Sequence, residues 1–334
     1  MTPRIVLRAF SLAALLALSC ASANASAAHT IRFATIAPRA STWGKVLEAW
    51  QKAVEEKTGG QIELNIYFNE VQGDERTVVS KMRTGQLDGA ALSAIGLSHV
   101  FNDVMVLQMP GITNSWPLAE LVRNMLHEPI EQGFRAAGFE LLSWGDIGLV
   151  YQFSKGVEVR SPTDLRGKRP MVFRNEPMAP LFFSLIGQIV PVPLDIAEVL
   201  PALQAGTVNV VGAPPLAAEQ LQWVPYLDHI NDQPIVAAIG ATLMKQERLE
   251  AIPADTRTLF RDMQRRAARV QSDRIRQLDL EARDRLMKRM TIVHPTDDDK
   301  IEWYRVFLKA VKRLRNGVFS KPLIDEVLSI TGKG

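Results

Sequence analysis

The sequence is almost free of cysteine, because Cys20 is the only one among 334 residues. It lies in an N-terminal segment where Arg4 and Arg8 precede an apolar run over residues 9–18, which is too short to cross a bilayer. Basic residues followed by such a run and by small residues are typical of a secretory signal peptide, and we predict one over residues 1–28. Its removal leaves a mature chain without disulfides or thiol chemistry.

The predicted signal peptide indicates export to the periplasm. Lipid anchoring through Cys20 is the alternative. We favour it less because Ala17 occupies the position where a lipoprotein signal usually has leucine.

The chain also lacks a strong excess of charge and, after the leader, any long apolar run. Its 39 basic and 36 acidic residues give a formal net charge of +3. So small a charge gives no support for nucleic-acid binding. A membrane-spanning helix needs about 20 apolar residues in succession, so we expect any membrane role to depend on a partner.

Signatures of catalysis, cofactor binding and metal binding are missing as well. The five histidines lack zinc-ligand spacing, there is no G-x-G-x-x-G motif, and Gly167 with Lys168 lacks the rest of a phosphate-binding loop. Ser93 lacks the flanking glycines of a hydrolase nucleophile. The acidic pair Asp74 and Glu75 is better explained by the preference of helix N-termini for acids. We therefore predict a protein that is not an enzyme and uses no cofactor or metal.

What the sequence does contain is an alternation of strand and helix patterns. Residues 31–34 and 62–68 have the apolar content of strands, and apolar residues at helical spacing follow each of them. Repeated β-α-β order predicts an α/β fold with a mostly parallel sheet, which binds ligands at the carboxyl ends of its strands. A helical pattern over about 254–290 would extend about 55 Å, so we expect it to bridge two domains.

Several short motifs occur in an order that resembles one family. They are Gly-Asp-Glu at 73–75, Met-Arg-Thr-Gly-Gln-Leu-Asp-Gly at 82–89, Asp-Leu-Arg-Gly-Lys-Arg-Pro at 164–170, Val-Pro-Val-Pro at 190–193 and Glu-Val-Leu-Pro-Ala-Leu-Gln-Ala-Gly at 198–206. Together they resemble the DctP-type solute-binding proteins, the extracytoplasmic receptors of TRAP transporters. Members of that family have two α/β domains joined by crossing strands and a long helix, and they close over one ligand between the domains.

The resemblance implies a two-domain periplasmic-binding-protein fold with a hinge. We expect domain I to contain residues 29–145 and about 236–265, and domain II to contain residues 146–235 and about 266–334, with the helix at 254–290 bridging both. It also implies uptake driven by an ion gradient, in which the receptor delivers its ligand to a separate two-part membrane permease.

The chain departs from the family pattern where that pattern has polar cleft residues. Two arginines are replaced, one on a crossing strand and one on the strand after Gly167, where an extra residue leaves two positions possible. A polar stretch after a later strand is replaced by small and apolar residues. The positions concerned are Val150, then Met171 or Val172, then Val211, Gly212, Ala213 and Pro214.

These replacements all make the expected cleft less polar. A buried carboxylate without a cationic partner is unstable, whereas apolar ligand surface gains about 25 cal/mol per Å² on burial and methionine adapts to irregular shapes. We therefore expect a neutral or hydrophobic ligand. The alternative is that Arg174, shortly beyond the expected position, turns into the cleft and binds a carboxylate; otherwise it is a surface residue.

Four further residues are candidates for contact with the ligand, namely Trp43, Trp144, Asp146 and Tyr151. For Trp43 we favour the alternative that it is the first residue of a helix's core face. Trp144 and Tyr151 suit either a pocket wall or a hinge. Asp146 is a candidate hydrogen-bond acceptor for the ligand, but we favour the alternatives that it is solvated or that it caps nearby backbone.

Two other classes of function stay open. In one, the cleft is vestigial and the surface binds another periplasmic protein, with a helical-repeat protein as a candidate partner. In the other, the protein is a periplasmic hydrolase. The receptor interpretation predicts one ligand per protein and closure without turnover. A hydrolase would form product, and a vestigial cleft would bind no small molecule.

Overall fold

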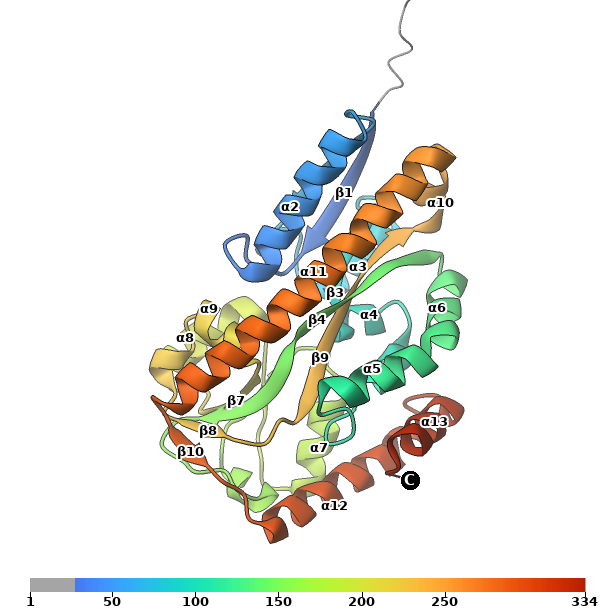
Figure 1. The fold of residues 1–334 in the computed structure, drawn as a ribbon. Helices are drawn as coiled ribbons and strands as arrows, with labels where there is room; N and C mark the ends of the chain where they lie inside the picture. Colours follow the sequence, from blue (N-terminus) through green and yellow to red (C-terminus); the bar gives the residue numbers. More distant parts are fainter. Residues whose placement is uncertain (1–27, 334) are drawn as a thin grey trace, which may run out of the picture.

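The computed structural model describes residues 28–333. The predicted signal peptide, apart from Ala28, and the anchoring site at Cys20 lie outside the described residues. Two lobes are joined by a pair of strands and a long helix (Figure 1).

A sheet of eight strands runs through both lobes in the order β10-β8-β4-β9-β3-β1-β2, with β7 paired to β4. Its strands are β1 (His29–Thr35), β2 (Ile62–Tyr67), β3 (Gly89–Ser93), β4 (Phe139–Ser154), β7 (Val210–Ala213), β8 (His229–Asn231), β9 (Val236–Lys245) and β10 (Thr291–Val293). A separate small sheet in the second lobe contains β5 (Met171–Phe173) and β6 (Val192–Leu194).

Helices cover the sheet in both lobes. Those of the first half of the chain are α2 (Thr42–Lys57), α3 (Glu75–Arg83), α4 (Ala94–Ser98), η1 (Asn102–Gln108), α5 (Trp116–Met125) and α6 (His127–Ala136). The remaining ones are η2 (Pro162–Leu165), α7 (Met178–Ile186), α8 (Ile196–Gln204), α9 (Pro215–Gln220), η3 (Val224–Tyr226), α10 (Gln246–Glu250), α11 (Ala254–Met287), α12 (Asp297–Leu314) and α13 (Lys321–Thr331).

The sheet is mixed, whereas the β-α-β order predicts a mostly parallel one. β1 pairs in parallel with β2 and β3, as expected, but β9 pairs antiparallel with β3 and β4. The reason is that β4 and β9 cross between the lobes in opposite directions, which local patterns do not reveal. The predicted two-domain α/β class is confirmed.

β4 carries the chain from the first lobe into the second. It pairs with β9 along most of its length, and its last residues pair with β7 and β8. The pairing with β9 shifts register between Asp146 and Gly148, and Gly148 has φ +150°. A Cβ at Gly148 would lie 2.4 Å from Cβ of Pro214, so only glycine allows the second lobe to approach the strand here.

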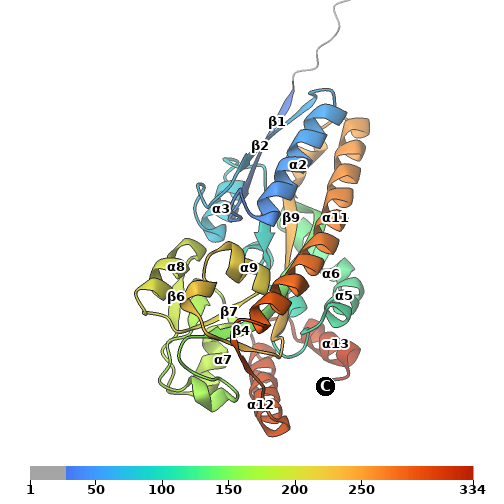
Figure 2. The same ribbon diagram turned by 60° about the vertical axis from the view of Figure 1, so that its left-hand side comes forward.

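The predicted bridging helix is observed as α11, which has 34 residues and is about 51 Å long. It packs against α2 of the first lobe, against β4 and against α9 of the second lobe. Figure 2 shows it running along most of the molecule. The long domain-spanning helix is therefore confirmed.

The C-terminal helices also connect the lobes. α12 packs against α7 in the second lobe, but Val311 and Leu314 near its end belong to the core of the first lobe. α13 packs against α5 and η1 of the first lobe. The residue boundaries of the two domains stay a prediction, with α13 lying against first-lobe elements.

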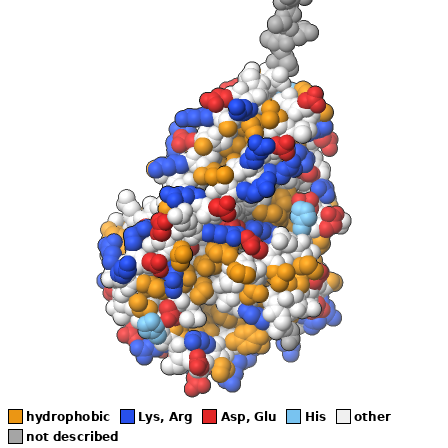
Figure 3. Space-filling view, in the orientation of Figure 1, with side chains coloured by type: hydrophobic (Ala, Val, Ile, Leu, Met, Phe, Trp, Pro, Cys, Tyr) orange, Lys and Arg blue, Asp and Glu red, His pale blue; other side chains and the backbone are white. Residues whose placement is uncertain are grey.

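Within residues 28–333, no helix is both long and apolar enough to cross a bilayer. Figure 3 shows basic and acidic side chains intermixed over one face, with apolar side chains gathered in its lower half.

Candidate functional site

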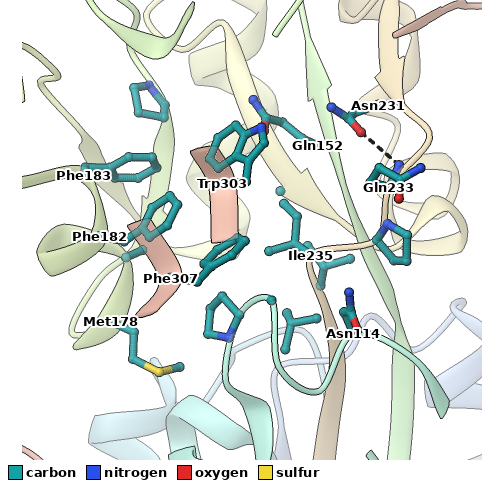
Figure 4. Close-up of a pocket in the computed structure, with 18 of the residues that line it drawn as sticks. Asn114, Gln152, Met178, Phe182, Phe183, Asn231, Gln233, Ile235, Trp303 and Phe307 are labelled. Carbon is teal, nitrogen blue, oxygen red and sulfur yellow. Dashed lines mark hydrogen bonds between the residues drawn. The ribbon is translucent and has the colours of Figure 1, made fainter. Parts of the chain in front are cut away.

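A cavity of about 460 Å³ lies between the lobes. Its walls come from the loop after η1 in the first lobe, from β5 and α7 in the second lobe, and from β4 and α12, which join the two (Figure 4). Pockets for small organic molecules typically measure about 300–1,000 Å³. The size and position of this cavity make it the candidate ligand site.

Strand alternation decides which predicted residues reach this cavity. On β4, Val150 and Gln152 line it, whereas Tyr151 between them joins the core of the second lobe. β7 pairs with this stretch so that Gly212 lies opposite Gln152, and Gly212 lines the cavity too. A glycine at that position leaves space for a ligand beside Gln152.

An aromatic cluster forms one wall. The ring of Phe182 on α7 stacks on Trp303 of α12, with centroids 5.8 Å apart and planes within 4°, and on Phe307 at 5.0 Å and 20°. Trp303 and Phe307 lie one helical turn apart, and the indole N–H of Trp303 donates to the carbonyl of Arg160 at 2.6 Å. The wall is thus a stack of three apolar rings, of which Trp303 is held by a hydrogen bond. Figure 4 shows the three rings close together.

Among the amide side chains that line the cavity, Asn231 and Gln152 differ in their hydrogen bonding. Asn231 donates to the carbonyl of Val159 at 3.0 Å and accepts from the N–H of Gln233 at 2.9 Å (Figure 4). Gln152 is 8% exposed, and its Nε2 has no hydrogen-bond partner among the described residues. Asn231 therefore supports the wall, whereas Gln152 retains unused hydrogen-bonding capacity.

The cations at the cavity have protein partners. Lys333 Nζ donates to the carbonyls of Gly111 at 2.7 Å and Ile112 at 3.1 Å, and burial lowers the pKa of Lys333. Lys300 lies 3.0 Å from the carboxylate of Asp297. Among the described residues that line the cavity there is no arginine.

The acid at the cavity is also engaged. The Glu176 carboxyl accepts the backbone N–H groups of Met178 at 2.9 Å and Ala179 at 2.5 Å, at the start of α7. Burial raises the pKa of Glu176. Its role is to cap the helix that carries the aromatic wall.

A smaller cavity of about 150 Å³ lies at the carboxyl ends of β1 and β3, between α2, α9 and α11. Trp43 and Trp144 both line it, and neither indole N–H has a hydrogen-bond partner among the described residues. Trp43 also packs against the cluster of Leu216 on α9 with Ile275 and Ala282 on α11. The volume is below the usual range for a ligand pocket.

Asp146 lines this smaller cavity but is committed to the protein. It is 1% exposed, and its carboxylate binds Arg123 at 3.0 Å and Arg276 at 2.6 Å. The prediction that it is a solvated residue is wrong, because two arginines from α5 and α11 converge on it. This buried cluster of one carboxylate and two guanidinium groups connects β4 to both helices.

The predicted site residues thus separate into groups by location. Those that line the larger cavity are Val150, Met171, Val172 and Gly212. Those that line the smaller one are Trp43, Trp144 and Asp146. Those in the core of the second lobe are Tyr151, Val211 and Ala213, and Pro214 is the N-cap of α9. Their roles in binding a ligand stay predictions.

Arg174 lines neither cavity. Its side chain is 41% exposed and binds Asp195 at 3.1 Å and Glu198 at 2.6 Å, at the start of α8. These bonds hold the pKa of Arg174 above its usual value. The structure therefore places Arg174 as the surface residue of the two alternatives.

The sequence reasoning missed the aromatic wall and Gln152. A signal for Gln152 was present, because it follows Val150 by two residues on a strand and must share its face. Phe182, Trp303 and Phe307 had the spacing of helix faces, but nothing local indicates that α7 and α12 meet over a cavity.

The chain is similar in sequence to known proteins. Residues 33–316 match the DctP family, described as "Bacterial extracellular solute-binding protein, family 7". A solute-binding protein of Verminephrobacter eiseniae is 26% identical over 280 residues, which cover 82% of each chain. The 2,3-diketo-L-gulonate-binding periplasmic protein of Escherichia coli is 23% identical over 56% of this chain and 57% of its own.

Solved structures show the same fold at lower identity. A TRAP periplasmic solute-binding protein from Ralstonia eutropha with bound (S)-2-acetolactate has a TM-score of 0.82 and 18% identity, covering 92% of this chain and 99% of its own. One from Sulfitobacter with bound β-D-galacturonate has a TM-score of 0.81 and 15% identity, covering 91% and 100%. With the family match over most of its length, this chain belongs to the DctP family of bacterial extracellular solute-binding proteins.

Proposed function

We propose that this protein is the periplasmic receptor of a TRAP-type secondary transporter, which closes its lobes over one neutral or hydrophobic molecule and delivers it to a membrane permease. The observation that carries the proposal is the cavity of about 460 Å³ between the lobes, whose walls are mostly apolar. Family membership and the TRAP receptors among the structural neighbours support the transport role and the periplasmic location.

The preference for an apolar ligand rests on the lining of the cavity. Met171, Val172 and the aromatic wall are apolar. Burial of apolar ligand surface against them is favourable by about 25 cal/mol per Å². A ligand carboxylate would need a cationic partner to offset its desolvation. The lysines at the cavity are already bound to carbonyls or to an aspartate. The expected ligand therefore differs in chemistry from the acids bound by the structural neighbours.

A single polar group on the ligand would be accommodated by Gln152. Its carboxamide can donate or accept, and it lies on the apolar side of β4 opposite Gly212. A molecule with an apolar body and one carbonyl or hydroxyl group therefore matches the cavity better than a sugar acid with many polar groups.

A ligand in the cavity would change how the two lobes are arranged. The loop after η1 belongs to the first lobe, and β5 and α7 belong to the second, so a ligand in the cavity touches both. Such a ligand binds the closed form preferentially and shifts the population toward it. A permease can then distinguish the loaded receptor from the empty one.

Mass spectrometry of the molecules that copurify with the protein tests the proposal. We expect an apolar or singly polar compound after denaturation and solvent extraction. Calorimetric titration of refolded protein with acetophenone and benzoate, which share a ring and differ in charge, is a second test. We expect acetophenone to bind more tightly. Copurification of a sugar acid, or tight binding of benzoate or succinate alone, would contradict the apolar preference.

A further inference from the structure

The two lobes touch each other directly at the start of α2. Thr42, the first residue of α2, belongs to the first lobe, and Gln220, the last residue of α9, belongs to the second. The N–H of Thr42 donates to Gln220 Oε1 at 3.0 Å, and Gln220 Nε2 donates to Thr42 Oγ1 at 2.8 Å. Figures 1 and 2 both show α9 just below the start of α2. One amide thus makes two hydrogen bonds across the gap between the lobes.

The N-terminus of α2 explains why such a contact forms. The first N–H groups of a helix have no partner within it. The Ser41 side chain accepts from the N–H of Gly44 at 3.1 Å, but the N–H of Thr42 finds its partner on the other lobe. If the lobes separate, water can replace Gln220 at little net cost. The contact is therefore suited to forming and breaking repeatedly.

Apolar packing reinforces the hydrogen bonds. Trp43, the next residue of α2, packs against an apolar cluster formed by Leu216 of α9 with Ile275 and Ala282 of α11. Separation of the lobes would expose part of this surface. The hydrogen bonds and the apolar packing together therefore favour the closed arrangement more strongly than the hydrogen bonds would alone.

α9 is attached to α11 and to β4. The carboxylate of Asp279 on α11 accepts the N–H of Leu149 at 2.9 Å and that of Leu216 at 3.0 Å. Leu149 follows Gly148, where β4 bends between the lobes. α9 is thereby attached to the crossing strand, so Gln220 is held at a fixed place relative to the bend.

Like charges meet at another rim of the cleft. Glu70 of the first lobe lies near Asp195 of the second, and burial together with Asp195 raises the pKa of Glu70. Arg174 offsets part of this repulsion by binding Asp195. Closure also brings Glu70 to the start of α8, where the backbone N–H of Ala197 opposes the effect of Asp195 on its pKa.

We propose that Gln220 and Thr42 form a latch that positions the two lobes in the closed state. Gln220 does not line the larger cavity, so the latch acts on closure and not through contact with a ligand there. The inference goes beyond the proposed ligand chemistry and does not depend on it. A sugar acid found as the natural ligand would contradict the apolar preference and leave the latch untouched.

The distance between the lobes is the quantity to measure. Spin labels at Lys52→Cys on α2 and Ala205→Cys at the end of α8, in protein with Cys20→Ser, report it by pulsed electron resonance. Both label positions are exposed. The protein is measured as purified and again after refolding without bound molecules. We expect Gln220→Ala to lower the ratio of closed to open molecules about threefold to tenfold.

Three further variants separate a latch from a merely structural role. Gln132→Ala removes an exposed amide that bonds only within α6, and we expect it to change nothing. Gln220→Glu should restore closure, because its oxygens accept both the N–H and the O–H of Thr42 and its charge suits a helix N-terminus. Thr42→Val should have part of the effect of Gln220→Ala, and the two changes should not be additive.

Two results would overturn the inference. One is a closed-to-open ratio in Gln220→Ala and Thr42→Val that equals the ratio in Gln132→Ala. The other is the absence of a closed population from the wild-type protein in both preparations. Melting temperatures of all variants check that each of them folds.

Discussion

Gln152 is a buried polar residue whose amide nitrogen has no hydrogen-bond partner in the described part of the chain. Unpaired buried donors destabilise proteins by about 1–3 kcal/mol, so a residue of this kind is typically retained for function. We expect Gln152→Leu to raise the free energy of unfolding by about 1 kcal/mol and to weaken binding of ligands that carry a carbonyl group. Denaturant unfolding and calorimetric titration measure the two effects.

Asn231 offers the matched control for that prediction. It lines the same cavity, but both ends of its amide are hydrogen bonded to the backbone. Asn231→Leu should therefore lower the free energy of unfolding. If Gln152→Leu were as destabilising as Asn231→Leu, Gln152 would have a structural partner after all.

Arg174 is predicted to contribute little to ligand affinity. Its guanidinium is exposed and bound to Asp195 and Glu198, and exposed ion pairs typically contribute little. We expect Arg174→Ala to change the dissociation constant of the copurifying ligand by less than about threefold. A carboxylate clamp would instead lose more than about 2 kcal/mol, and titration calorimetry distinguishes the two.

At the scale of elements, the contact between α11, β4 and α9 depends on one carboxyl group. Asp279 is 4% exposed, and burial raises its pKa to about 6, while the N–H groups of Leu216 and Leu149 oppose the shift. A carboxyl group whose pKa is higher in the folded state binds a proton more readily there than in the unfolded chain. Its contribution to stability is therefore greatest below about pH 4 and is lost as the pH rises to about 6.

Asp279→Asn removes this titration. We expect the wild-type protein to lose more unfolding free energy than the variant between pH 4 and pH 6.5, by up to about 3 kcal/mol. Denaturant unfolding at both pH values measures the difference, because the other titrating groups are common to both proteins. Equal losses in the two proteins would show that Asp279 has an ordinary pKa.

At the scale of the whole molecule, four elements connect the lobes. β4 and β9 cross between them, α11 contacts both, and α12 packs on α7 while its end enters the core of the first lobe. We therefore expect the lobes to unfold in one transition. Thermal unfolding followed by tryptophan fluorescence and by far-ultraviolet circular dichroism should give coincident curves. Two separate transitions would show that the connections are too weak to couple the lobes.

Much of the fold follows from local patterns in the sequence. Apolar alternation at 62–68 marks β2, and apolar residues at helical spacing mark α2 and nearly the whole of α11. The direction of β4 and β9 was not predictable, because strand pairing is decided by contacts far apart in the chain. The mixed sheet is the result of that long-range pairing.

The candidate site was only partly predictable for a similar reason. Val150 and Gly212, which the resemblance places at the cleft, both line the larger cavity, while their roles in binding stay predictions. The burial of Asp146 was not predictable, because the two arginines that bury it come from separate helices. The aromatic wall depends on α12 crossing back over α7, which no local pattern encodes.

The aromatic wall also determines when the cavity can exist. Trp303 and Phe307 belong to α12, which follows every described strand in the chain. A chain that emerges from its N-terminus can pair its strands and form most of both lobes before α12 arrives. Until then the cavity lacks one side, so we expect the ability to bind a ligand to appear only after α12 has packed against α7.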